Sequence, residues 1–273
     1  MNERHIIICA DDYGISPAVN AAIRDLIVRQ RINATSVIVA APSFNRAEAQ
    51  ALLAAAGSRA AIGLHVTLTA PFRPLSHNFA PLRNGAFLPL PATLGRAFVS
   101  GFKIEQLVQE ISSQFAAFSS AFGRVPDFVD GHQHAHLFPQ IRDAFLRVTK
   151  KAAPNAWVRQ CGRIGRARTV SDPKALLLNG LSRSFRRFAA DHGLRTNPGF
   201  AGTYVFRPGA DYAAQFPGFL DRLPSGGVIM CHPGKVDAEL KRIDPVTDLR
   251  AREYAFFASD AFVRLLAERG ITL

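Results

Sequence analysis

Short runs of β-branched and apolar residues alternate with helix-patterned segments along this 273-residue chain, and this alternation is the strongest constraint on its fold. The run Ile6-Ile7-Ile8-Cys9 precedes Ser16-Pro17, a pair typical of a helix start because serine caps the helix and proline suits its first turn. Farther along, Leu107, Ile111 and Phe118 recur at helical spacing. About seven alternations predict an α/β fold whose parallel strands curl into a distorted (β/α) barrel.

The expected elements follow from the same patterns. Strands are expected over 5–10, 36–40, 60–68, 127–133, 156–160, 203–207 and 227–231, with a last short strand over 271–273. Helices are expected from Pro17 to Arg29, over 44–56 and 104–122, after Pro139, and over 173–192, 210–222 and 247–269. No repeat or composition break divides residues 1–273, so we expect one catalytic domain.

Residues 70–102 differ from the rest of the chain because they are rich in proline, which breaks regular structure. We expect a loop or lid here rather than a linker. Its aromatic side chains, Phe72, Phe79 and Phe87, either cover a binding site or anchor the loop to the barrel, and the sequence leaves both open.

The formal charge of +12 is concentrated in one segment. Residues 142–195 hold 13 Lys or Arg against three Asp. Such a segment suits nucleic acid, an anionic membrane surface or an acidic substrate, or is simply a solvated outer face. Few aromatic residues are interleaved with the charges, so base stacking is not indicated and we expect no nucleic-acid partner.

The sequence has no run of about 18 apolar residues and no signal-peptide pattern, so we expect a cytoplasmic protein without a transmembrane segment. Its three cysteines, Cys9, Cys161 and Cys231, show no metal-binding spacing, and we expect them to be reduced and partly buried.

Acidic and imidazole side chains follow four of the expected strands. They are Asp11 and Asp12, His65, the stretch Asp130 to His136, and His232. Each has a purely structural alternative, such as a helix cap for the aspartates or a buried core residue for His65. The carboxyl ends of parallel strands meet at one edge, however, so these groups are expected to gather there. Carboxylates and imidazoles together bind metals and move protons, which predicts a metal-dependent hydrolase.

The three imidazoles His132, His134 and His136 point to one side if their segment stays extended. Positions two apart along a strand are about 6.6 Å from each other, whereas a metal–nitrogen bond is about 2.0–2.1 Å. One metal therefore binds one or two of them. Asp130 is placed to orient a ligand imidazole by accepting its second N–H.

In this combination and order, the motifs resemble those of the YdjC-type carbohydrate deacetylases, which include chitooligosaccharide deacetylases and hopanoid-biosynthesis-associated members. The matching segments are Ala10-Asp11-Asp12-Tyr13-Gly14, Gly63-Leu64-His65-Val66-Thr67-Leu68-Thr69, Asp130-Gly131-His132-Gln133-His134-Ala135-His136-Leu137 and His232-Pro233-Gly234. The resemblance implies a barrel of about seven parallel strands related to the polysaccharide deacetylase fold. It also implies an acetylated amino-sugar substrate, as an oligosaccharide or a glycolipid.

By this resemblance, one divalent metal ion, zinc or magnesium, is held by Asp12, His65 and His132, with Asp11 as general base and His232 as general acid. Asp130, His134 and His136 are expected to contact either the substrate or the metal ligands. His134 also stays open as an alternative metal ligand in place of His132. Arg159 is expected to pair with Asp11 or to bind a substrate oxygen. Related proteins are often homodimers, and a peripheral contact with an anionic membrane stays open.

Two other functions remain as alternatives. The first is a metal hydrolase of the amidohydrolase or phosphoesterase type, in which a His-x-His pair usually follows the first strand; here Asp11-Asp12 occupies that place. The second is a non-catalytic protein that binds through its basic segment, with binding that depends steeply on salt and survives metal removal.

Overall fold

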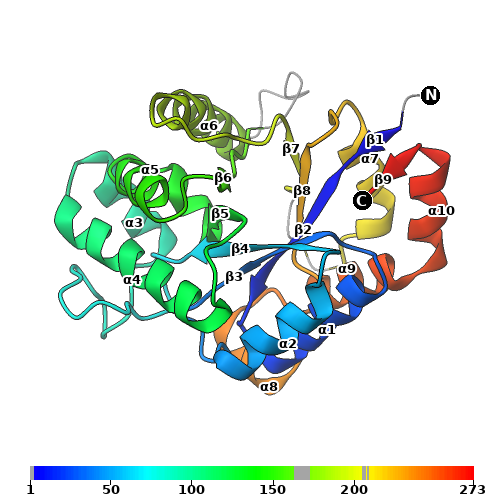
Figure 1. Cartoon of the computed structure of the whole chain (residues 1–273), viewed down its shortest axis with the longest axis horizontal. Coiled ribbons are helices and arrows are strands. Elements are labelled where there is room, and N and C mark those ends of the chain that lie inside the picture. Colours follow the sequence, from blue (N-terminus) through cyan, green and yellow to red (C-terminus); the bar gives the residue numbers. More distant parts are fainter. Residues whose placement is uncertain (1–2, 163–172, 205–206, 208) are drawn as a thin grey trace.

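The computed structural model describes residues 3–162, 173–204, 207 and 209–273 and has a curled parallel sheet at its centre (Figure 1). The seven strands of this sheet have the order β6-β5-β4-β3-β2-β8-β7. Their bounds are β2 Ile7–Tyr13, β3 Ala34–Val37, β4 Ala61–Val66, β5 Phe128–Gly131, β6 Trp157–Val158, β7 Phe200–Ala201 and β8 Val228–Cys231. A separate parallel pair, β1 (Arg4–His5) with β9 (Ile271–Thr272), brings the two ends of the chain together. The expected fold, a distorted (β/α) barrel of about seven parallel strands, is confirmed.

Helices connect the strands and cover the sheet (Figure 1). Their bounds are α1 Pro17–Val28, α2 Arg46–Ala56, α3 Leu90–Phe98, α4 Ile104–Phe122, α5 Ile141–Ala152, α6 Pro173–Asp191, α7 Tyr212–Leu220, α8 Ala238–Ile243, α9 Asp248–Ala258 and α10 Asp260–Glu268, with a short 3₁₀ segment η1 at His132–Leu137. The Ser16 side chain caps α1 by accepting the backbone N–H of Val19, and Pro17 occupies the first turn, as expected. The described helices do not include one that is both long and apolar enough to span a bilayer.

The central strands are buried on both faces, as is typical of a parallel sheet between helices. All four residues of β3 and all four of β8 are buried. Because every neighbouring pair in the seven-stranded sheet is parallel, the carboxyl ends of its strands lie at one edge. This arrangement brings residues as distant in sequence as Asp11 and His232 to the same part of the molecule.

The structure differs from the expected elements in four places. Residues 90–98 form α3 inside the segment expected to be irregular, because two of its prolines stand at positions that a helix start tolerates. The helix expected over 247–269 is two helices, separated at Ser259, whose side chain caps α10. Residues 203, 204 and 207 of the strand expected over 203–207 are not in a strand, and residues 205–206 lie outside the described part of the chain. A short strand, β7, lies just before them at Phe200–Ala201. The short helix α8 was not expected.

The segment between β4 and α3 is anchored to the barrel. Its aromatic side chains Phe72, Phe79 and Phe87 are all buried. The buried carboxylate of Glu110 in α4 accepts the backbone N–H of Leu75 at 3.2 Å and of Ser76 at 2.8 Å. Phe79 and Phe87 pack on each other with ring centres 5.1 Å apart, as an anchor would, whereas Phe72 lies edge-on to the ring of His132 with ring centres 5.4 Å apart.

Candidate active site

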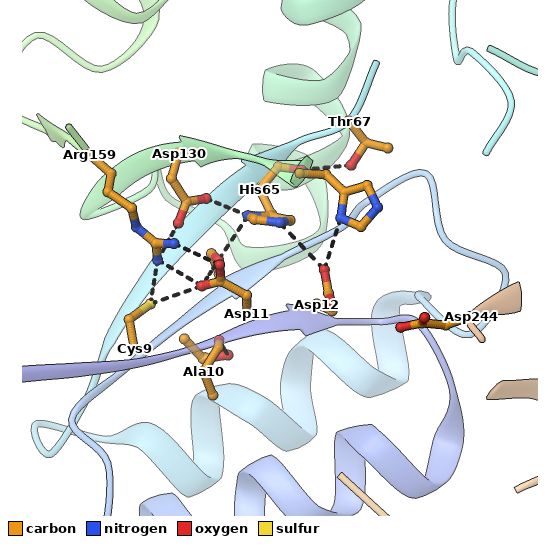
Figure 2. A network of polar contacts seen from close by, with 12 residues as sticks. Cys9, Ala10, Asp11, Asp12, His65, Thr67, Asp130, Arg159 and Asp244 are labelled. Carbon is orange, nitrogen blue, oxygen red and sulfur yellow. Dashed lines mark hydrogen bonds and ion pairs between the residues drawn. The ribbon is translucent and has the colours of Figure 1, made fainter. Parts of the chain in front are cut away.

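The groups expected at the strand ends do gather at one edge of the sheet (Figure 2). Asp11 and Asp12 come from the end of β2, where the pairing with β3 is irregular between Ala10 and Tyr13. Asp12 has a positive φ of 70°. Neighbouring residues of a regular strand point to opposite faces, and this irregularity breaks that alternation. It lets both carboxylates serve the same site.

Asp12, His65 and His132 form a compact group of potential ligands, with donor atoms within 4.8 Å of one another. Oδ1 of Asp12 lies 3.0 Å from Nδ1 of His132 and 3.4 Å from Nε2 of His65. Donor atoms arranged tetrahedrally about 2.1 Å from a common centre are separated by roughly 3.4 Å. The spacing of the donor set therefore fits one divalent cation. These are the three residues expected to bind the metal.

The ring of His65 is oriented by Asp130, whose Oδ1 lies 2.6 Å from Nδ1 of His65. This contact turns Nε2 of His65 toward Asp12, the arrangement in which a carboxylate supports a metal-binding histidine. Burial alone would lower the pKa of His65, but the Asp130 carboxylate and Asp12 raise it to about 10. The charges that favour a proton on this ring also favour a metal cation.

Asp11 is paired with Arg159 through both carboxylate oxygens (Figure 2). Nη1 of Arg159 lies 2.6 Å from Oδ2 and Nη2 lies 2.7 Å from Oδ1. The Ser36 hydroxyl donates a further hydrogen bond to Oδ1 at 3.2 Å. Burial would raise the pKa of Asp11, but the Arg159 guanidinium outweighs it and holds the pKa well below its usual range. Asp11 is therefore an ionised carboxylate.

A second group of potential ligands consists of Cys9, Asp11 and Asp130. The guanidinium of Arg159 contacts all three of these side chains. Its Nη2 lies 2.9 Å from Sγ of Cys9 and 2.5 Å from Oδ2 of Asp130 (Figure 2). A fully buried guanidinium already supplies the positive charge that this second group of acids needs. Within the described chain, the arrangement fits one exchangeable cation beside one fixed arginine.

The three histidines after β5 do not share a side, contrary to the expectation for an extended segment. They lie in η1, where Gln133 and His134 have positive φ values of 53° and 58°. His132 faces Asp12, whereas Nδ1 of His134 lies 3.4 Å from Sγ of Cys161. His136 is buried and donates from Nε2 to the carbonyl oxygen of Arg159 at 2.8 Å. One of the three histidines therefore joins the ligand group.

The turn that separates these histidines depends on Gly131. A Cβ atom on Gly131 would lie 2.8 Å from Nδ1 of His136 and 2.9 Å from its Cβ. A larger residue would push the His136 ring away, and this ring packs against Phe145 and Phe185. Burial lowers the pKa of His136 to about 4, so its ring is neutral near pH 7.

His232 follows β8 and lines the same cavity as the ligand group. Its backbone N–H donates to Oε2 of Glu253 at 2.5 Å, and Oε1 of Glu253 accepts the hydroxyl of Tyr204 at 2.6 Å. Glu253 is fully buried, and burial raises its pKa. The hydrogen bond to Glu253 therefore fixes the backbone of His232 to helix α9.

The same helix carries a residue that the sequence analysis missed. Nη2 of the buried Arg250 lies 2.5 Å from Oδ2 of Asp12 and 2.6 Å from Oδ2 of Asp244. Arg250 and Glu253 are three residues apart, and Phe257 follows four residues later, so all three share the buried face of α9. The sequence did contain a signal for Arg250 and Glu253, because these charged residues fall at the helical spacing of the apolar residues that α9 buries.

A cavity of about 440 Å³ opens above these groups. Asp11, Asp12, His65, His132 and His232 contribute to its lining. Most of the other lining side chains are apolar and come largely from α3, α6 and the loops near them: Leu90, Pro91, Leu94, Phe138, Leu177, Leu178, Leu181, Met230 and Val246. His134, Asp244 and Arg250 also reach the cavity, so His134 faces the space beside the ligand group without joining it.

Comparisons with known proteins agree with this fold. A protein of Enterococcus faecalis, provisionally assigned to cellobiose-phosphate cleavage, superposes with a TM-score of 0.76 at 22% identity over 100% of this chain and 97% of its own. A family 4 carbohydrate esterase of Streptococcus mutans superposes with a TM-score of 0.52 at 13% identity over 99% of this chain and 85% of its own. At these identities, both likenesses concern the fold alone. The sequence pattern of the family described as YdjC-like protein matches residues 5–268. The chain is thus a member of the YdjC-like family.

Proposed function

We propose that this chain is a metal-dependent hydrolase that removes the N-acetyl group from an acetylated amino sugar. The observation that carries the proposal is the convergence of Asp12, His65 and His132 on one point beside the ionised carboxylate of Asp11. Membership of the YdjC-like family and the resemblance of its motifs to carbohydrate deacetylases support the choice of reaction.

Asp12, His65 and His132 would hold the metal ion, and Asp130 would keep His65 in the orientation that binding requires. One carboxylate and two imidazoles accept zinc and also magnesium, and three protein ligands leave room for water and substrate. A bound divalent cation supplies a more acidic water and polarises the acetamide carbonyl.

Asp11 acts as the general base in this proposal. Arg159 keeps Asp11 ionised and fixes its two oxygens, and Asp11 then takes the proton of the attacking water. A carboxylate in an ion pair is a weak base, and a weak base would suffice here because the metal would lower the pKa of the water. Once the tetrahedral centre collapses, the carbon–nitrogen bond breaks and acetate is released.

His232 is the proposed general acid, which gives a proton to the departing amine. It lines the cavity beside the ligand group, and Glu253 holds its backbone in place. His134 also faces the cavity and is placed to contact the sugar, whereas the buried His136 stabilises the turn. In this proposal the carboxylate of Asp11 removes a proton from the water, and the imidazole of His232 donates a proton to the amine.

The cavity supports a glycolipid more than a free oligosaccharide. A volume of about 440 Å³ lies within the usual range of small-molecule sites. Polar groups gather at the metal-ligand end, whereas leucines of α3 and α6 form much of the walls. This division suits a sugar headgroup on the polar side and an apolar substituent against the walls.

The test is acetate release from N-acetylglucosamine compounds, both free oligosaccharides and glycolipids, after chelation and after re-addition of single divalent metals. We expect metal-dependent release, greater with the glycolipids. Phosphate esters and cyclic amides are the comparison substrates, because turnover of these alone would favour an amidohydrolase or phosphoesterase. Absence of acetate release from every sugar with every metal would contradict the proposed reaction.

A further inference from the structure

The outer surface of helices α5 and α6 carries a dense positive charge. We define this basic face by its exposed cations, Arg147, Lys150, Lys151, Arg183, Arg186, Arg187 and Arg195. The described acids of this region are Asp143, which pairs with Arg142 at 2.8 Å, and the exposed Asp191. Positive charge therefore strongly exceeds negative charge on this surface.

The two helices form one rigid support for these cations, and Figure 1 shows them next to each other. The Arg142 guanidinium of α5 lies 3.7 Å from the ring centre of Phe188 in α6 and donates to the Ser184 hydroxyl at 2.8 Å. At the far end, Nζ of Lys150 donates to the carbonyl oxygen of Gly193 at 3.3 Å. Six of the seven cations are consequently held on the two packed helices, and Arg195 follows the end of α6.

The two ends of the outer face of α6 differ in chemical character. Leu176, Gly180, Arg183 and Arg187 are exposed and follow one another at intervals of three or four residues, so they form a single stripe. The opposite side of the helix is buried through residues such as Phe185. The stripe is apolar at its N-terminal end and basic toward its C-terminal end.

The apolar end of this stripe lies beside the mouth of the cavity. Leu176 is 49% exposed and Leu177 is 41% exposed, and Leu177 also lines the cavity. One exposed leucine is ordinary on a protein surface. Two adjacent exposed leucines that connect a basic surface to an apolar-walled cavity are the combination found on helices that lie in a membrane interface.

We propose that the basic face and Leu176 dock this chain onto an anionic lipid bilayer, with the cavity mouth directed toward the headgroups. Cations near an anionic bilayer each strengthen binding by about fivefold. A leucine at the same surface adds an apolar contact with the acyl boundary.

A nucleic acid is the weaker fit for this face. Single-stranded nucleic acids usually stack their bases on exposed aromatic rings. Here Phe185 is buried, Phe188 is covered by the Arg142 guanidinium, and Trp157 is stacked on Phe128 with ring centres 4.5 Å apart. The exposed leucines have no counterpart in the phosphate backbone, whereas a bilayer accepts both charges and leucines.

The experiment measures binding of the purified full-length chain to vesicles by flotation, without substrate. The vesicles are phosphatidylcholine alone or phosphatidylcholine with phosphatidylglycerol, each at low and at physiological salt. We expect binding to the anionic vesicles that weakens with salt, because salt screens the exposed charges. Because no turnover is measured, the result does not depend on whether the proposed deacetylation is correct.

A matched pair of variants separates this face from the overall charge. Arg183→Glu with Arg187→Glu should weaken binding at least about 30-fold, since two cations are lost at the surface. Arg46→Glu with Arg264→Glu changes two exposed arginines on α2 and α10 and alters the net charge by the same amount. This control pair should retain most of the binding. Leu176→Ser should cause an approximately 10-fold loss that remains at high salt.

Three results would overturn the proposal. The wild-type chain binds neither vesicle, or the control pair weakens binding as much as the α6 pair, which would show attraction by net charge alone. In the third, single-stranded RNA or duplex DNA binds more tightly than anionic vesicles and responds to the same α6 substitutions, which would assign the face to nucleic acid.

Discussion

Two adjacent aspartates at the end of β2 have different surroundings, and the difference accords with the two roles proposed for them. Both oxygens of Asp11 contact Arg159, at 2.6 and 2.7 Å. In Asp12, Arg250 contacts Oδ2 at 2.5 Å, while Oδ1 faces the imidazoles of His65 and His132. The bidentate contact with Arg159 keeps Asp11 ionised, whereas the contact of Arg250 with one oxygen leaves the other oxygen of Asp12 facing the two imidazoles.

The largest expected effect comes from removing the one-sided carboxylate. Asp12→Ala should lose both the metal and all turnover, because His65 and His132 alone provide too few ligands. Metal content after dialysis and acetate release measure the two losses. An Asp12→Ala protein that still holds a stoichiometric metal would show that the ligand group is wrongly assigned.

The matching substitution one residue earlier should separate the two functions. Asp11→Asn should keep the metal but reduce turnover by about 10²- to 10⁴-fold, the usual contribution of a general base. Metal content and kcat are measured on the same preparation as for Asp12→Ala. Loss of metal from Asp11→Asn, or undiminished turnover, would remove the distinction between the two aspartates.

The two arginines should differ in what they stabilise. Arg159→Met leaves the buried carboxylates of Asp11 and Asp130 without their cation, which should lower the free energy of unfolding by about 3–5 kcal/mol in a urea titration. The Arg250 guanidinium instead contacts Asp12, a proposed metal ligand. Arg250→Lys keeps the charge but loses the fork that holds Asp12 and Asp244, so metal affinity should fall about 10-fold.

The exposed Arg252 on the same helix supplies the control, because Arg252→Lys changes neither Asp12 nor Asp244 and should leave metal affinity unchanged. Equal metal affinity in Arg250→Lys and Arg252→Lys would mean that Arg250 does not position the ligand. Unfolding of Arg159→Met at the wild-type urea concentration would likewise show that its ion pairs contribute little net stability.

A pH dependence should separate His136 from the aspartates. The folded-state pKa of His136 is about 4, below its unfolded value of about 6.5. The unfolded chain therefore takes up the proton first, so the contribution of His136 is full above about pH 6.5 and falls by about 3 kcal/mol as the pH drops to about 4. His134, whose pKa burial also lowers, adds to the loss in the same direction. Asp11 and Asp12 have lowered pKa values, so their contribution is lost only at still lower pH.

Unfolding titrations between pH 7 and 4, with a chelator present, measure this slope. His136→Gln removes the titrating ring while keeping a donor for the Arg159 carbonyl, and its stability should vary less with pH in this window. His65, whose pKa is raised, is protonated in both states below about pH 6.5 and adds no slope there. An unchanged slope in His136→Gln would assign the loss to another group.

The sequence located most of the elements, because amphipathic and β-branched patterns are local. The helix expected over 104–122 is α4, Ile104–Phe122. The irregular segment 70–102 was less well predicted, since a proline density that excludes a helix interior is compatible with the start of α3. The helix pattern over 247–269 likewise concealed the boundary at Ser259, because apolar residues on both sides of it are buried, Phe256 and Phe257 in α9 and Phe262 and Leu266 in α10.

The sequence by itself determined which chemical groups would meet, because the carboxyl ends of parallel strands share one edge wherever a strand ends in Asp or His. Tertiary structure alone decided what each group contacts. The positive φ values at Asp12 and His134 direct neighbouring side chains to different partners, and those partners, Arg159, Arg250 and Cys161, are distant in sequence. Local patterns record how often a residue faces the core, whereas the direction of a side chain within a turn is set by contacts that exist only after folding.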